Sequence, residues 1–73
     1  MPQQKVYWIT PLGSADDFGI PFDKVMYDAK TRMGPWANMA PSSFRTYGLG
    51  RLGTGFGQKY EKQADGRWLK VEG

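Results

Sequence analysis

The fold of this chain is decided by the stretch from Met33 to Tyr60, MGPWANMAPSSFRTYGLGRLGTGFGQKY. A turn at Gly34-Pro35 opens it, and a short helix is predicted to begin at Pro41. Proline suits the first position of a helix, and glycine suits the position just past its end, which Gly48 provides. Five of the ten glycines lie from Gly48 to Gly57. Because glycine has no side chain, this run predicts a backbone that bends sharply or lies close against another segment.

Short strands are predicted on both sides of this stretch. The β-branched and aromatic residues of 5–10, KVYWIT, and the segment 22–28 favour strands, and residues 35–39 favour a third strand in a hairpin with the second. Residues 57–72 predict a C-terminal hairpin that turns at Ala64-Asp65-Gly66. Residues 11–21 predict a loop, since they hold two prolines, two glycines and two aspartates. The expected fold is a single α+β domain, residues 1–73: a small twisted antiparallel sheet with one short helix and long loops.

Aromatic side chains must form the core of so short a chain. The 73 residues include eleven aromatics and no cysteine, so disulfides and thiolate metal sites are excluded. Phe18 and Ile20 are expected to anchor the loop to the core, and Tyr60 and Trp68 to form a cross-strand core pair. Large apolar groups lie on both faces of residues 5–10, which fits either a strand covered on both sides or one exposed for a partner.

Catalytic chemistry finds little support. With neither histidine nor cysteine, the serines have no conventional activating base. Asp16-Asp17 is interpreted as a pair of solvated turn or cap residues rather than a metal or acid–base site. Gly48 to Gly53 matches G-x-G-x-x-G, but it follows a predicted helix rather than a strand, so no dinucleotide is expected. We expect a protein that is not an enzyme and has no cofactor or metal. No apolar run approaches the roughly 20 residues of a membrane span, so no membrane association is expected.

Charge is distributed unevenly along the chain. Residues 1–28 carry two lysines and four aspartates, a net charge of −2, whereas residues 29–73 carry eight cations and three acids, a net charge of +5. Such asymmetry predicts either a basic face that meets phosphate or an acidic protein, or a mixed surface that only faces water. The candidate partner-binding or RNA-binding residues are Lys30, Arg32, Arg45, Arg51, Lys59, Lys62 and Arg67.

Residues 15–60 resemble small phage-encoded proteins of zinc-ribbon type, most specifically at GPWANM and at GLG-x-LGTG-x-GQKY. In that frame the four cysteine ligands would stand at Ala15, Phe18, Ala40 and Ser43, none of which can bind zinc as a thiolate does. The resemblance implies a ribbon-like fold in which apolar packing replaces the metal, with Phe18 as the filler.

Over its whole length the chain also resembles the small RNA-polymerase-binding regulators of lytic Xanthomonas phages, which inhibit host promoter use and act as antiterminators. The resemblance implies a monomer in the cytoplasm of the infected bacterium. It would bind the N-terminal part of the largest polymerase subunit near the RNA exit path, with nascent RNA as a second candidate partner. Two other classes stay open: a free-standing single-stranded RNA- or DNA-binding protein, and a structural or virion accessory protein.

Overall fold

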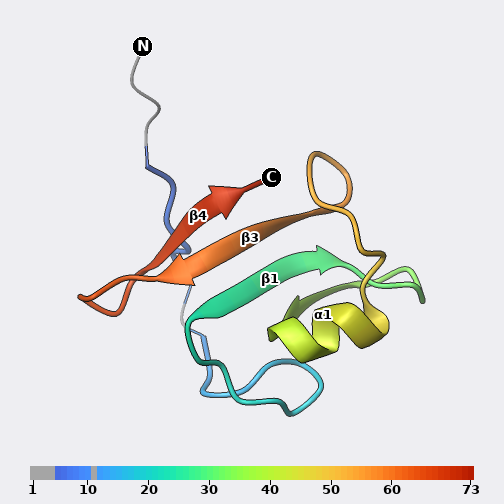
Figure 1. Ribbon diagram of the computed structural model, residues 1–73, viewed down its shortest axis with the longest axis horizontal. Coiled ribbons are helices and arrows are strands. Elements are labelled where there is room, and N and C mark those ends of the chain that lie inside the picture. Colours follow the sequence, from blue (N-terminus) through green and yellow to red (C-terminus); the bar gives the residue numbers. More distant parts are fainter. Residues whose placement is uncertain (1–4, 11) are drawn as a thin grey trace.

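A four-stranded antiparallel sheet carries one short helix in the computed structural model, which describes residues 5–10 and 12–73 (Figure 1). The elements in chain order are β1 (Val25–Lys30), β2 (Trp36–Met39), α1 (Pro41–Tyr47), β3 (Gly57–Lys62) and β4 (Trp68–Glu72). The strands lie in the order β2-β1-β3-β4. This arrangement confirms the predicted fold class, the helix from Pro41 and both hairpins. The predicted loop 11–21 begins at a residue outside the described part of the chain.

The first hairpin places alternate residues of β1 and β2 on opposite faces of the sheet. Tyr27 pairs with Met39, Ala29 with Ala37, and Lys30 with Trp36. Between the strands, the Thr31 hydroxyl donates to the Pro35 carbonyl oxygen at 2.7 Å and closes the turn.

Helix α1 packs on the face formed by the smaller residues of this hairpin. Ala29, Ala37 and Met39 are buried there, and Phe18, Tyr27 and Phe44 pack against them. The rings of Tyr27 and Phe44 stack with 4.1 Å between centroids and an interplanar angle of 6°. Because a helix of seven residues is not stable alone, this stack and its apolar neighbours hold α1 in place.

The loop before β1 is fastened to the other end of the same helix. Phe18 stacks on Tyr47 with 4.1 Å between ring centroids, so the prediction that Phe18 anchors the loop is confirmed. Ile20 is exposed, so its predicted role as a second anchor is wrong. The backbone amide of Ile20 instead donates a hydrogen bond to the Asp16 carboxylate at 2.8 Å. This polar contact, rather than the Ile20 side chain, holds this part of the loop.

A second small core lies on the opposite face of the sheet. Met26, fully buried, pairs across the strands with Tyr60, and the Tyr60 ring meets Trp8 edge to face at 5.7 Å. Trp68 meets Phe22 at 5.9 Å in a similar edge contact. The predicted cross-strand pair of Tyr60 and Trp68 is therefore wrong. The register opposes Tyr60 to Lys70, and each ring finds its partner in the N-terminal part of the chain.

Residues 5–10 do not form the regular strand that their composition predicts. They pair with β4 only where Tyr7 faces Leu69, with hydrogen bonds from the Trp8 amide to the Trp68 carbonyl and from the Lys70 amide to the Val6 carbonyl. Only Tyr7 and Trp8 of this segment are half-buried, whereas 49% of Val6 and 92% of Ile9 are exposed. The interpretation of a strand covered on both sides is therefore also wrong.

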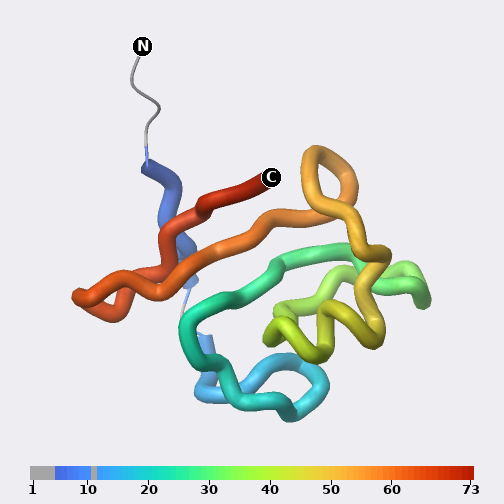
Figure 2. The backbone as a smooth tube through the Cα atoms, in the orientation of Figure 1, coloured from blue at the N-terminus to red at the C-terminus, as the bar shows by residue number. Residues whose placement is uncertain are grey.

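Two glycines of the run from Gly48 to Gly57 are required by close approach to a neighbouring segment. Gly48 ends α1 against Phe44, where a β-carbon would lie 2.6 Å from the Phe44 carbonyl oxygen. Gly57 begins β3 directly opposite Ala29, where a β-carbon would lie 2.8 Å from the Ala29 α-carbon. Between them the chain leaves the end of α1, makes a loop and returns to the sheet (Figure 2). The prediction that part of the glycine run lies close against another segment is confirmed at these positions.

Candidate basic and aromatic interface

Both ends of the glycine loop, residues 48–56, are joined to the last residue of β1. The Lys30 amide donates to the Phe56 carbonyl oxygen at 2.9 Å, and the Leu49 amide approaches the Lys30 carbonyl oxygen at 3.4 Å. Thr31 forms an isolated bridge with Gly48. These contacts bring the loop beside the β1–β2 turn, residues 31–35, although the two are far apart in sequence (Figure 1). We call this part of the molecule, residues 30–36 and 47–56, the basic end.

Three of the predicted cations lie at the basic end, and two of them are positioned by contacts there. Arg32 donates from its backbone amide to the Tyr47 carbonyl at 2.8 Å and from Nε to the Gly48 carbonyl at 3.2 Å. The Arg51 guanidinium lies 4.3 Å from the centroid of the Phe56 ring. Lys30, the third, is the half-buried last residue of β1. Because Arg32 and Arg51 are held against the protein, their charges are presented from defined positions.

Apolar side chains are exposed around these cations. Met33 at the β1–β2 turn is 68% exposed and Trp36 at the start of β2 is 47% exposed. Tyr47 and Leu49 are also exposed at the end of α1 and the start of the loop. Large aromatic and methionine side chains beside arginine are typical of binding surfaces. Exposed together at one end, they mark it as the strongest candidate interface.

The basic end contains no carboxylate side chain. Residues 29–60 include five cations, Lys30, Arg32, Arg45, Arg51 and Lys59, and neither aspartate nor glutamate. The cations at this end are therefore not offset by acids from their own segment. A surface of this kind attracts an anionic partner over several ångströms at physiological salt.

The remaining predicted cations lie elsewhere. Arg45 is exposed on the last turn of α1, and Lys59 is half-buried in β3, opposite Tyr27. Lys62 ends β3 beyond Glu61, which pairs with Val25 at the start of β1. Lys30 ends β1, so at roughly 3.3 Å per residue the two lysines are on the order of 15 Å apart or more. The structure therefore does not gather the predicted cations into one patch.

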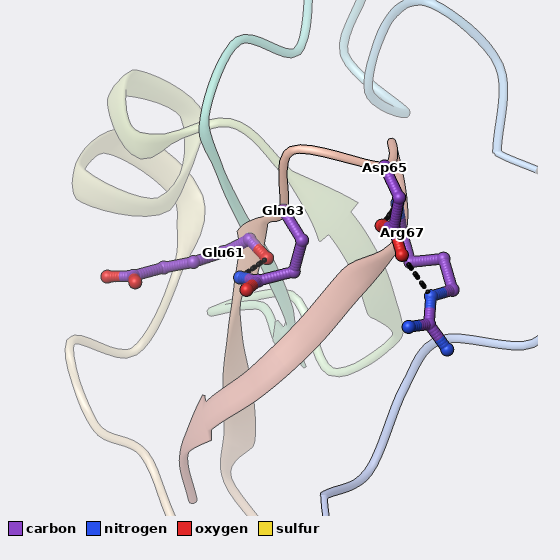
Figure 3. Close-up of polar contacts among 4 residues, drawn as sticks. All are labelled: Glu61, Gln63, Asp65 and Arg67. Atoms are coloured by element: carbon purple, nitrogen blue, oxygen red, sulfur yellow. Dashed lines mark hydrogen bonds and ion pairs between the residues drawn. The ribbon is translucent and has the colours of Figure 1, made fainter.

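Arg67 is engaged in the β3–β4 turn at that distant end (Figure 3). Its Nε lies 2.7 Å from Oδ2 of Asp65, and its guanidinium lies 4.1 Å from the centroid of the Tyr7 ring. The hydrogen bonds from the Arg67 backbone amide and side chain lower the pKa of Asp65. In the same turn Gln63 donates to the Glu61 carbonyl oxygen at 3.0 Å. A cation that already faces a carboxylate is a weaker candidate for binding a phosphate than Lys30, Arg32 or Arg51.

A half-buried carboxylate lies inward of the basic end. Asp28 is on the same face of β1 as Lys30, and Asn38 donates to it at 3.5 Å. Burial raises the pKa of Asp28, and the nearby Asp17 raises it further. Burial and the charge of Asp28 together raise the pKa of Tyr60, whose hydroxyl donates to Gln58 at 2.9 Å. On this face of the sheet, the basic surface therefore ends at Asp28, which is the next residue of β1 after Lys30 toward the middle of the strand.

Asp16 occupies the region where the resemblance to zinc ribbons would place the metal ligands. Its Oδ1 accepts from the amides of Phe18 and Ile20, and its Oδ2 accepts from the amide of Ala40. Burial opposes ionisation of Asp16, but the contacts with Ser43, Ala40, Ile20 and Phe18 outweigh it and lower the pKa. The fully buried Ser43 hydroxyl lies beside the carboxylate without a well-aligned hydrogen bond. The interpretation of Asp16 as a turn residue is confirmed, but its expected exposure to solvent is wrong, because the side chain is buried and accepts hydrogen bonds from three backbone amides.

Among the described residues, no group of three or more acids, histidines or cysteines could hold a metal ion. Nor does any helix in residues 5–10 and 12–73 have the length and apolarity that crossing a membrane requires. Comparison of the chain with protein-family models, curated proteins and solved structures finds no match.

Sequence reasoning missed the exposed apolar members of the interface. The strand prediction for residues 35–39 does not say which face of the sheet Trp36 takes, although the alternation in WANM indicates it. Two small or flexible apolar residues, Ala37 and Met39, alternate in β2 and face α1, so Trp36 must face the other way. Met33 and Leu49 lie in a turn and a loop, where no periodicity could have predicted their exposure.

Proposed function

We propose that this protein is a non-enzymatic phage regulator that binds the RNA polymerase of its bacterial host. It binds the N-terminal region of the largest subunit near the RNA exit channel, inhibits promoter-dependent initiation and promotes antitermination. The proposal draws on the resemblance of the whole chain to phage polymerase-binding regulators. It places the protein in the cytoplasm of the infected cell, acting as a monomer without a cofactor.

The structural observation that carries the proposal is the basic end. Arg32 and Arg51 are held by the protein itself, with Met33 and Trp36 exposed beside them. A few aromatic and arginine anchors commonly provide most of the binding energy of a protein interface. The uncompensated charge accelerates encounter with an anionic surface and makes the association rate depend on salt.

The mechanism follows from shape as well as charge. The Cα atoms extend 36 × 27 × 18 Å, and the helix and loops are fastened to the sheet by ring stacks and hydrogen bonds. A rigid wedge of this size, bound at the rim of the exit path, hinders a terminator hairpin from forming there. The same bound wedge competes with the contacts that initiation factors make on the polymerase.

The proposal is tested by association with purified polymerase. Tagged protein is mixed with the polymerase holoenzyme of the bacterial host, and retained subunits are measured at increasing salt. We expect stoichiometric retention at low salt that weakens as salt rises, with the Arg32→Gln/Arg51→Gln variant retained less than Lys59→Gln/Lys62→Gln of equal charge. Polymerase that is not retained by the wild type at any salt concentration contradicts the proposal.

A free-standing single-strand nucleic-acid binder is the second candidate, favoured by the exposure of Trp36 beside Lys30. It predicts binding to bare RNA at about micromolar concentration or below, with a strong salt dependence. The polymerase regulator is expected to bind bare RNA much more weakly than this. A titration of labelled single-stranded RNA without polymerase therefore separates the two functions.

A further inference from the structure

Trp36 and Lys30 face each other across the edge of the sheet. They are register partners in β2 and β1, so their side chains lie on the same face. Their neighbours Ala29 and Ala37 are buried toward α1, which places Trp36 and Lys30 on the face that the helix does not cover. Trp36 is 47% exposed, so about half of this large residue faces solvent, directly across the strands from Lys30.

The surroundings of this ring are those of a nucleic-acid surface more than of an apolar docking patch. On the same face the next residue of β2 is Asn38 and the next residue of β1 is Asp28, both polar. The backbone of Lys30 is hydrogen-bonded to Leu49 and Phe56 of the glycine loop, and Arg51 lies against the Phe56 ring. Both cations therefore lie on the side of Trp36 that is nearest the glycine loop. A base needs one exposed ring and its flanking phosphates need cations, and this face of the basic end offers both.

We propose that the basic end binds single-stranded RNA, with one base stacked on Trp36 and flanking phosphates paired with Lys30, Arg32 and Arg51. The source of the RNA rests on the proposed function, since the transcript leaving the polymerase is the single strand that this surface would meet. Carboxylate repulsion from Asp28 keeps the backbone of the strand at the edge of the sheet. The RNA therefore crosses the basic end rather than running along β1 and β3.

Photo-crosslinking in a transcription complex tests this placement. A halted elongation complex carries one 4-thiouridine in the transcript segment that has just left the enzyme, and the protein is added at saturating concentration. The variants are Trp36→Ala, Trp36→Phe, Lys30→Gln/Arg51→Gln and, as a control of equal charge at other positions, Lys59→Gln/Lys62→Gln. Polymerase retention and the melting curve are measured for each variant, so lost binding or lost folding is recognised separately.

The wild type should crosslink to RNA within residues 30–36 or 47–56. Loss of the stacking ring in Trp36→Ala should reduce the crosslink yield about tenfold, while Trp36→Phe keeps most of it. The Lys30→Gln/Arg51→Gln variant should also lose yield, and the Lys59→Gln/Lys62→Gln control should not. A Trp36→Ala variant that stays bound to polymerase and crosslinks like the wild type overturns the inference. So does a wild-type transcript crosslink that maps only outside residues 30–36 and 47–56, because the RNA then passes a different surface.

A second measurement keeps the inference testable if polymerase binding itself fails. Labelled single-stranded RNA is titrated with the protein at low salt, and the dissociation constant is followed as salt rises. Three phosphate contacts give a slope of roughly −2 in log affinity against log salt, and removal of two cations reduces its magnitude by about 1.4. A slope that Lys30→Gln/Arg51→Gln leaves unchanged rejects the RNA site, whether or not the protein binds polymerase.

Discussion

The Asp16 carboxylate accepts a hydrogen bond from the backbone amide of Ala40, with 2.8 Å between Oδ2 and N. Its other oxygen accepts the amides of Phe18 and Ile20, at 2.9 and 2.8 Å. One buried side chain therefore shapes its own loop and joins it to the start of α1. In a chain without cysteine, this carboxylate performs the cross-linking that small domains often obtain from a disulfide or a metal.

Replacing Asp16 by asparagine should destabilise the domain. The amide keeps one acceptor oxygen but places an NH₂ group against donors, so the Ala40 contact or the loop contacts are lost. Hydrogen bonds to a charged group contribute about 1.5–3 kcal/mol, and a loss of at least 2 kcal/mol is expected near neutral pH. Chemical denaturation of the wild type and Asp16→Asn measures the difference. Asp23→Asn, at an exposed position just before β1, serves as the control, and an equal effect of both variants contradicts the assignment.

The same carboxylate gives the stability a defined acid dependence. The folded-state pKa of Asp16 lies below its ordinary value of 3.8, so the ionised form stabilises the fold. This contribution is complete above pH 3.8 and is lost as the pH falls through the lower folded-state pKa. Wild-type stability should therefore fall in that acid range, while Asp16→Asn shows a shallower fall. Parallel pH profiles for the two proteins would exclude Asp16 as the cause.

Replacing Asp28 by asparagine should raise the stability of the domain at neutral pH, the opposite of the effect expected for Asp16→Asn. Burial and Asp17 raise the folded-state pKa of Asp28 above 3.8, so ionisation costs stability as the pH rises through that raised value. Above it, Asp28→Asn removes the cost and should raise the melting temperature of the domain. Below pH 3.8 the carboxyl is protonated in both states and the charge-dependent gain should vanish. A variant that is less stable than the wild type at neutral pH contradicts this account.

The stack of Tyr27 on Phe44 should be indispensable to α1. Phe44→Ala removes the ring that covers Ala29 and Met39, and truncations of this kind cost about 3–5 kcal/mol. That approaches the total stability of a domain of this size, which is on the order of 4–11 kcal/mol. Near-ultraviolet circular dichroism should show lost tertiary structure for Phe44→Ala and a smaller change for Phe44→Leu. A cooperative unfolding transition of wild-type midpoint in Phe44→Ala would show that the helix is held by other contacts.

The local pattern predicted the elements well because their signals are chemical and short-ranged. Pro41 and Gly48 delimit α1, and Asp65-Gly66 lies in the β3–β4 turn. These residues act through their own backbone preferences, which a sequence displays directly. The glycines that approach Phe44 and Ala29 could be predicted as close contacts, but their partners could not.

Where prediction failed, the outcome depended on partners distant in the sequence. Tyr60 meets Trp8 rather than Trp68, and Ile9 is exposed although its segment has the composition of a strand. In both cases the strand register and the packing of neighbouring segments decide which side chains are buried. The β propensity of a residue indicates only that it fits a half-buried strand surface. The candidate site shows the same limit. The cations were visible in the sequence, but their division between two ends of the sheet follows from the strand pairing.

The central claim, that the basic end acts on the polymerase, is tested most directly by transcription through an intrinsic terminator in vitro. Readthrough is measured with wild type, Arg32→Gln/Arg51→Gln and the Lys59→Gln/Lys62→Gln control, which changes the net charge equally. The account predicts strong readthrough with wild type and the control, and readthrough at least several-fold lower with Arg32→Gln/Arg51→Gln. Equal readthrough with all three folded proteins, or none above background with wild type, would contradict it.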